Sequence, residues 1–62
     1  MATEILIIDD NTDIRNILDE LIQDAGYKTR LAANFNQGLS EIDKKLPDVA
    51  IIDVKLDKGD ND

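Results

Sequence analysis

The stretch ILIIDD, residues 5–10, decides how this chain of 62 residues folds. Its apolar residues are mostly β-branched and lie between charged residues, which indicates a strand buried on both faces of a parallel sheet. A second apolar block, VAII at residues 49–52, also ends in an aspartate, Asp53. Two such strands predict a central parallel sheet with carboxylates at the strand ends.

Two amphipathic segments separate the apolar strands. From residue 12, apolar residues recur with the spacing of one helix face until Gly26, which suits a helix end. A second stripe begins near Asn34 and closes at Pro47, and Gly38 within it should cost about 1 kcal/mol relative to Ala. We therefore expect strands at about 4–9, 27–32 and 48–54, helices at about 12–25 and 35–46, and an acidic loop at 55–62.

The order strand, helix, strand, helix, strand with short connections specifies a right-handed parallel α/β unit. The sequence alone does not order the strands. A doubly wound order 2-1-3 places the two apolar strands side by side, and we adopt this order as the expectation.

The composition excludes several functions. With 7 basic and 14 acidic residues, no Cys and no His, the formal charge is −7. Disulfides, thiolate or imidazole zinc sites and histidine-based nucleophile pairs are therefore excluded. The charge argues against direct binding of nucleic acid or of an anionic membrane. The N-terminus lacks a signal peptide's basic region and no stretch reaches the ~20 apolar residues of a membrane span, so we expect a cytoplasmic location.

Asp9, Asp10 and Asp53 follow the two apolar strands. In open α/β sheets the binding crevice lies at the carboxyl ends of the strands, so neighbouring strands would bring these side chains together. A hard divalent cation relieves the repulsion between carboxylates, and Mg²⁺ prefers such ligands. These aspartates could instead be ordinary turn and helix-start residues of an acidic chain. Their position after both apolar strands favours a magnesium site in which one aspartate attacks a phosphoryl group.

The sequence resembles the receiver domain of two-component response regulators. The motifs that carry the resemblance are ILIIDDN at residues 5–11, AGY at 25–27, NF at 34–35 and PDVAIID at 47–53. The resemblance implies a flavodoxin-like (CheY-like) α/β fold. A complete receiver has five strands and five helices in roughly twice as many residues, so residues 1–62 are expected to be a truncated receiver domain, the first half only.

The resemblance also implies a set of site residues. Asp53 would be the phosphoacceptor and Asp10 a direct ligand of Mg²⁺. Asp9 would act on the metal largely through bound water, and Lys55 would contribute its backbone carbonyl. The phosphoryl group would come from a sensor histidine kinase or a phosphotransfer protein.

On the first helix, Ile14 and Ile17 would belong to the kinase-docking face, although packing into the core is an equally good interpretation. Family members catalyse their own phosphorylation and dephosphorylation, so the resemblance implies a phosphoacceptor rather than an enzyme. The family's catalytic Lys and Thr/Ser are absent from this chain, which should impair its activity. The acidic loop, with Asp57 where the family usually has Pro, and the stretch Asp13-Ile14-Arg15 after the acidic pair look most like NtrX-type nitrogen regulators. The parent protein should therefore be a transcriptional regulator.

A second class of function is an assembly module. If the sheet stops after the third strand, residues 49–54, which are apolar except for Asp53, form an unprotected edge. Such an edge favours self-association, and the chain would then be a homo-oligomer, for example a homodimer, with two third strands paired across a two-fold axis.

Overall fold

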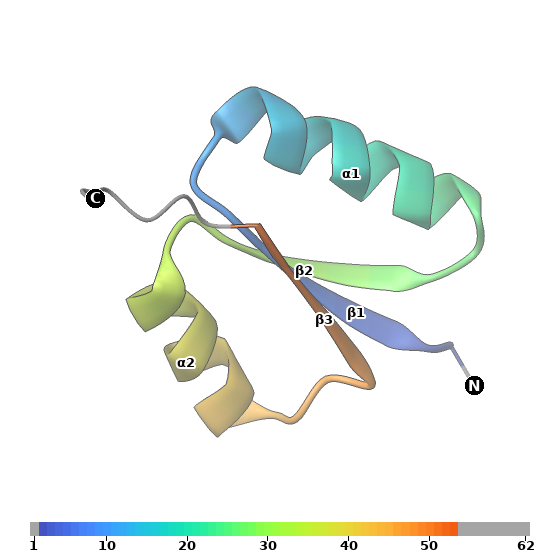
Figure 1. Cartoon of the computed structure of the whole chain (residues 1–62). Helices are drawn as coiled ribbons and strands as arrows, with labels where there is room; N and C mark the ends of the chain where they lie inside the picture. The colour runs from blue at the N-terminus through green and yellow to red at the C-terminus, as the bar shows by residue number, and fades with distance from the viewer. Residues whose placement is uncertain (1, 54–62) are drawn as a thin grey trace.

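The computed structural model describes residues 2–53 and contains three strands and two helices. These are β1 (Glu4–Asp9), α1 (Thr12–Asp24), β2 (Lys28–Ala32), α2 (Phe35–Lys44) and β3 (Val49–Asp53). The strands form one parallel sheet in the order β2-β1-β3, with α1 on one face and α2 on the other (Figure 1). The expected α/β fold and the 2-1-3 order are therefore confirmed. The expected loop at 55–62 lies outside the described residues.

The helix α2 ends at Lys44, two residues before the expected boundary. Lys45 is already extended, with φ −163° and ψ 130°. The next residue, Leu46, precedes Pro47, and the proline ring disfavours the helical conformation at that position. Pro47 therefore favours an end to the helix before Leu46, and not only at the proline itself.

The core is centred on β1. Leu6, Ile7 and Ile8 are almost completely buried. Leu6 and Ile8 pack with Ala32 of β2, and Ile42 of α2 covers this cluster. Because β1 lies between β2 and β3, with a helix on each face of the sheet, its last residue Asp9 is also buried.

Gly38 has a different role from the one its helix propensity suggests. It is the buried residue of α2. A Cβ atom added there would lie 2.9 Å from Cγ1 of Ile8 and closer still to Cδ1. The missing side chain therefore lets α2 approach the central strand.

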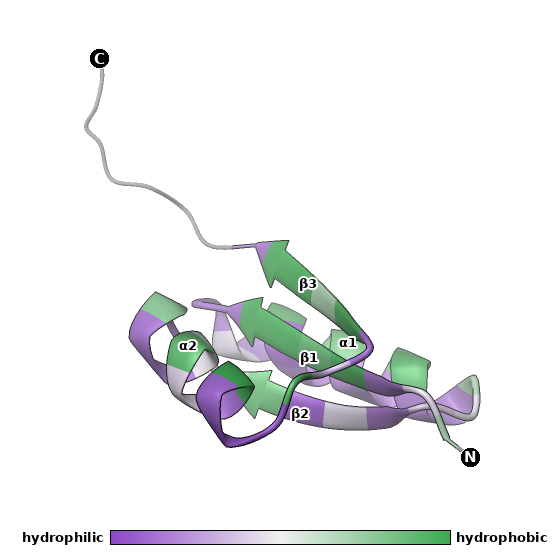
Figure 2. Cartoon of the chain, turned by 90° about the horizontal axis from the view of Figure 1, so that it is seen from below, coloured by the Kyte–Doolittle hydropathy of each residue, from purple (hydrophilic) through white to green (hydrophobic). Residues whose placement is uncertain are grey.

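The outer edge of β3 is open within residues 2–53, where β3 pairs only with β1. Val49 and Ile52 are 48% and 54% exposed. Figure 2 shows β3 at one side of the sheet with mostly hydrophobic residues along it. An apolar strand therefore lies at an edge, whereas such strands are usually central.

A polar cluster joins α1 to β2. The Thr29 hydroxyl donates to Oδ1 of Asp19, and Gln23 Nε2 donates to the same oxygen at 2.7 Å. These hydrogen bonds, chiefly the one from Thr29, lower the pKa of Asp19 because they favour the charged carboxylate.

We expect Thr29→Val to reduce the free energy of unfolding near neutral pH by about 0.5 kcal/mol, a low value for a hydrogen bond because the cluster is near solvent. A lowered pKa stabilises the fold above the carboxyl's unfolded-state pKa, and this contribution is lost as the pH falls through the folded-state pKa. The difference from wild type should therefore shrink in acid. Urea denaturation at neutral and acidic pH measures it. Thr29→Ser keeps the hydroxyl and should keep the wild-type pH dependence, and a difference for Thr29→Val that stays constant with pH would contradict the assignment.

Candidate metal and phosphoacceptor site

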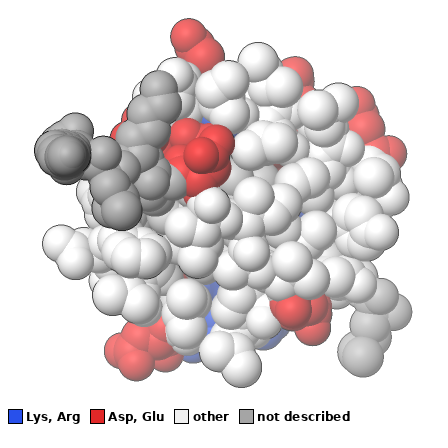
Figure 3. Space-filling model, viewed as in Figure 1, with Lys and Arg blue, Asp and Glu red and all other residues white. Residues whose placement is uncertain are grey.

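The carboxyl ends of β1 and β3 bring Asp9 and Asp53 together. The parallel register runs from Ile5↔Val49 to Asp9↔Asp53, so each strand finishes on an aspartate beside the other. Neighbouring strands lie about 4.8 Å apart. Figure 3 shows acidic side chains where β3 meets the grey trace, whereas Lys and Arg are scarcely visible on this face. The sheet therefore places two like charges side by side at its edge.

Asp9 is an unusual carboxylate because it is only 2% exposed. Its Oδ1 accepts a hydrogen bond from the backbone N–H of Asn11 at 2.9 Å. Its Oδ2 is buried and accepts no hydrogen bond from any group within residues 2–53. A buried carboxylate oxygen without a partner is costly, and a cation would remove that cost. The donor set therefore fits a hard metal ion such as Mg²⁺.

Asp10 lies one residue beyond β1 and is exposed. The part of the chain that the structure describes contains no group of three or more acidic side chains placed to hold a metal ion. In the structure Asp9 lies beside Asp53, but Asp10 does not join them to form a group of three carboxylates. The chain bends at Asp10 toward α1. The roles of Asp9, Asp10 and Asp53 stay predictions, and Lys55 lies outside the described residues.

The start of α1 is built around Asn11. Its side chain accepts a hydrogen bond from the N–H of Ile14 at 3.1 Å, which caps the helix. The cap places the first turn of α1 directly after the acidic pair.

Arg15 is a residue that the sequence analysis did not assign to the site. Its Nη1 donates to the backbone carbonyl of Asp9 at 2.8 Å. The available signal was a basic residue in the first turn of a helix, where the helix dipole disfavours positive charge. Its position five residues after Asp10 indicates a contact with the adjacent acidic segment.

Ile14 and Ile17 lie on the exposed surface of α1, with 41% and 51% of their area accessible. No residue of α1 is fully buried. Packing into the core therefore does not account for these side chains within residues 2–53, and their assignment to kinase docking stays a prediction.

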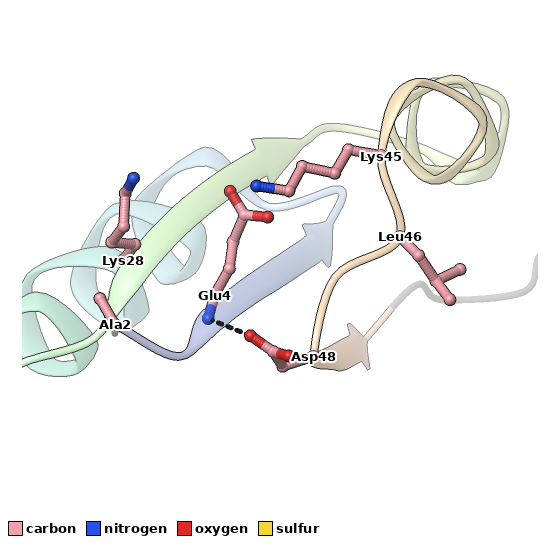
Figure 4. A pocket seen from close by; sticks show the side chains of 6 residues that line it. All are labelled: Ala2, Glu4, Lys28, Lys45, Leu46 and Asp48. Carbon is pink, nitrogen blue, oxygen red and sulfur yellow. Dashed lines mark hydrogen bonds between the residues drawn. The ribbon is translucent and has the colours of Figure 1, made fainter.

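The described residues also form an open hollow of about 240 Å³ at the opposite end of the strands. Its lining residues are Ala2, Glu4, Lys28, Lys45, Leu46 and Asp48 (Figure 4). Within it the N–H of Glu4 donates to Oδ2 of Asp48 at 2.7 Å, and the N–H of Asp48 donates to the carbonyl of Glu4 at 2.9 Å. These bonds join β1 to the start of β3, and the mixed charges of the lining favour no single ligand class.

Comparison with known families agrees with this geometry. The family described as the response regulator receiver domain matches residues 5–60. The chain belongs to this family. The resemblance seen in the sequence is thereby confirmed. Within the described residues, the receiver domain consists of the three-stranded sheet β2-β1-β3 and its two helices.

Curated relatives of the receiver include proteins named for sporulation and for nitrogen assimilation. The sporulation initiation phosphotransferase F of Bacillus subtilis is 41% identical over 56 residues, which are 90% of this chain and 45% of that protein. A putative NtrX-like response regulator of Rickettsia bellii is 36% identical over 59 residues, 95% of this chain and 12% of that protein. The nitrogen assimilation regulatory protein NtrX of Azorhizobium caulinodans is 36% identical over 56 residues, 90% of this chain and 12% of that protein.

This receiver thus spans less than half the length of each of these relatives. NtrX-type regulators are among its relatives, as the acidic loop suggested. No solved structure matches it. Among residues 2–53, neither helix has the length and apolar character needed to cross a membrane.

Proposed function

We propose that this receiver domain accepts a phosphoryl group on Asp53 in a Mg²⁺-dependent reaction. The observation that carries the proposal is the pairing of Asp9 with Asp53 at the strand ends, where one oxygen of the buried Asp9 has no hydrogen-bond partner among the residues that the structure describes. Asp53 is exposed and can be reached by a donor, whereas Asp9 is enclosed. The two carboxylates therefore suit different tasks: Asp53 can both accept the phosphoryl group and hold the metal, whereas Asp9 can act on the metal alone.

In the proposed reaction a carboxylate oxygen of Asp53 attacks the phosphorus atom of a phosphohistidine. A new O–P bond forms, the N–P bond breaks, and the leaving imidazole takes up a proton. Asp9, Asp10, Asp53 and the carbonyl of Lys55 would hold Mg²⁺, which supplies positive charge against the phosphoryl oxygens. The carboxylates alone would repel the donor, so the reaction requires the cation.

The proposed donor is a sensor histidine kinase or a phosphotransfer protein, and Ile14 and Ile17 would contact it. Both are exposed on α1, whose first turn follows the acidic pair. We further propose that the parent protein is a cytoplasmic transcriptional regulator, because relatives named as regulatory proteins include NtrX and the transcriptional regulatory protein YxdJ. Because the formal charge is −7, we propose that this segment does not bind nucleic acid directly.

The first test supplies the chain with a small acyl phosphate and Mg²⁺. We expect an adduct of about 80 Da, one phosphoryl group, that is labile to hydroxylamine as an acyl phosphate should be. Intact-mass spectrometry measures it. A matched incubation with a chelator should give no adduct. Absence of the adduct at saturating Mg²⁺, or its persistence with the chelator, would contradict the proposal.

Self-association is a second candidate function, and the open edge of β3 favours it. Two copies could pair their third strands antiparallel across a two-fold axis, which would cover Val49 and Ile52. Sedimentation velocity at micromolar concentration should then show a homodimer. Ile52→Lys should shift it toward monomer, whereas Leu39→Lys, at an exposed apolar residue of α2, should not. A compact monomer at all concentrations would contradict this function.

A further inference from the structure

We infer that Arg15 is a positioning residue that holds the peptide joining Asp9 and Asp10 in the orientation the metal site needs. This inference rests on the proposed function, since it concerns the same carboxylates. It assigns a role to a residue of α1 that provides none of the proposed ligands.

The geometry of the β1–α1 junction supports this role. Arg15 Nη1 donates to the carbonyl oxygen of Asp9 at 2.8 Å, in a partly buried contact. The N–H of Asn11 holds Oδ1 of the same residue at 2.9 Å. The backbone N–H of Arg15 donates to the carbonyl of Asn11 at 2.9 Å, which closes the first turn. Asp9 is thus fixed at both its carbonyl and its carboxylate, and the peptide plane that leads to Asp10 is fixed with it.

The electrostatics distinguish positioning from neutralisation of charge. A guanidinium beside two aspartates would ordinarily pair with a carboxylate. In the described residues, however, the ion pairs are made by Arg30 and Lys44, and Arg15 contacts a carbonyl. Both carboxylates therefore keep their capacity for a cation, while the position of the peptide between them is set.

The charge alone would have the opposite effect on metal binding. A positive group near a cation site lowers its affinity for Mg²⁺, so removing that charge should strengthen binding. Removing a group that orients ligands should weaken binding, typically by 10-fold or more. The sign of the change in affinity therefore separates the two roles.

The experiment measures Mg²⁺ dissociation constants for the full chain by calorimetry, with circular dichroism to verify folding. We expect Arg15→Ala to weaken binding by about 10-fold. Arg15→Lys keeps a donor and should recover most of the affinity. The charge-matched control Lys28→Ala removes a cation at the other end of the sheet and should leave affinity within about 2-fold of wild type. Binding by Arg15→Ala that equals or exceeds wild type would overturn the inference.

Amide hydrogen exchange without metal supplies the readout that does not depend on the proposed function. Arg15→Ala should accelerate exchange at Asn11, whose N–H bonds to Asp9, more than in the second half of α1. Unchanged exchange at Asn11 would overturn the inference even if wild type binds Mg²⁺. If wild type fails to bind Mg²⁺ while exchange at Asn11 still responds, the proposed site fails and Arg15 keeps only a structural role, which also overturns the inference. If Arg15→Ala does not fold, Arg15→Met, which keeps much of the side chain's length but has no hydrogen-bond donor, replaces it in both measurements.

Discussion

Asp53→Asn should abolish the phosphoryl adduct, with a loss of at least about 10³-fold in the rate of its formation. An amide lacks the anionic oxygen that attacks phosphorus, and Asp9 cannot substitute because it is buried. The variant should fold at least as well as wild type, since it removes repulsion between Asp9 and Asp53. Intact-mass spectrometry after incubation with an acyl phosphate and Mg²⁺ measures the loss.

The matched control for this experiment is Asp43→Asn, which makes the same change of charge on the exposed surface of α2. It should form the adduct at the wild-type rate. An adduct that survives in Asp53→Asn would show that another carboxylate is the acceptor, and peptide mapping would locate it.

Gly38→Ala should destabilise the fold, although alanine is the better helix former. The new Cβ would press on Ile8, which is 1% exposed in the core. Overpacking costs about 1–3 kcal/mol, and the gain in helix propensity offsets up to about 1 kcal/mol. We expect the free energy of unfolding to fall by about 1–2 kcal/mol as the net of these effects. Urea denaturation followed by circular dichroism, at one fixed protein concentration, measures the change.

Ser40→Ala is the control for this helix because Ser40 is exposed in α2. It should raise stability by a few tenths of a kcal/mol through propensity alone. If Gly38→Ala stabilised the protein as much as Ser40→Ala does, the close approach of α2 to β1 would be refuted.

Much of the fold follows from the sequence because apolar periodicity reports directly which faces are buried. The block at residues 5–8 is apolar throughout, and it forms the central strand covered on both faces. The block at 49–52 has the same pattern but lies at an open edge in the described residues, since periodicity indicates the capacity for burial and not the presence of a neighbour.

The site was less accessible to this reasoning. Spacing placed Asp9 and Asp53 at the same end of the sheet, and the register brings them side by side. It could not separate the buried Asp9 from the exposed Asp10, because that difference arises where the chain bends after β1. The role of Arg15 was missed because its partner is a backbone carbonyl, which every residue carries, so its place in the first turn of the helix was the one signal in the sequence.

The paired hydrogen bonds between Glu4 and Asp48 have a consequence at the opposite end of the sheet. The same number of residues separates Glu4 from Asp9 as separates Asp48 from Asp53. Fixing the first pair therefore sets the alignment of the second. If β3 slipped by one residue, the side chain beside Asp9 would change and Asp53 would face the other side of the sheet. The contacts at the start of β1 and β3 thus set the register of the two strands, and this register determines which carboxylates lie side by side where the strands end.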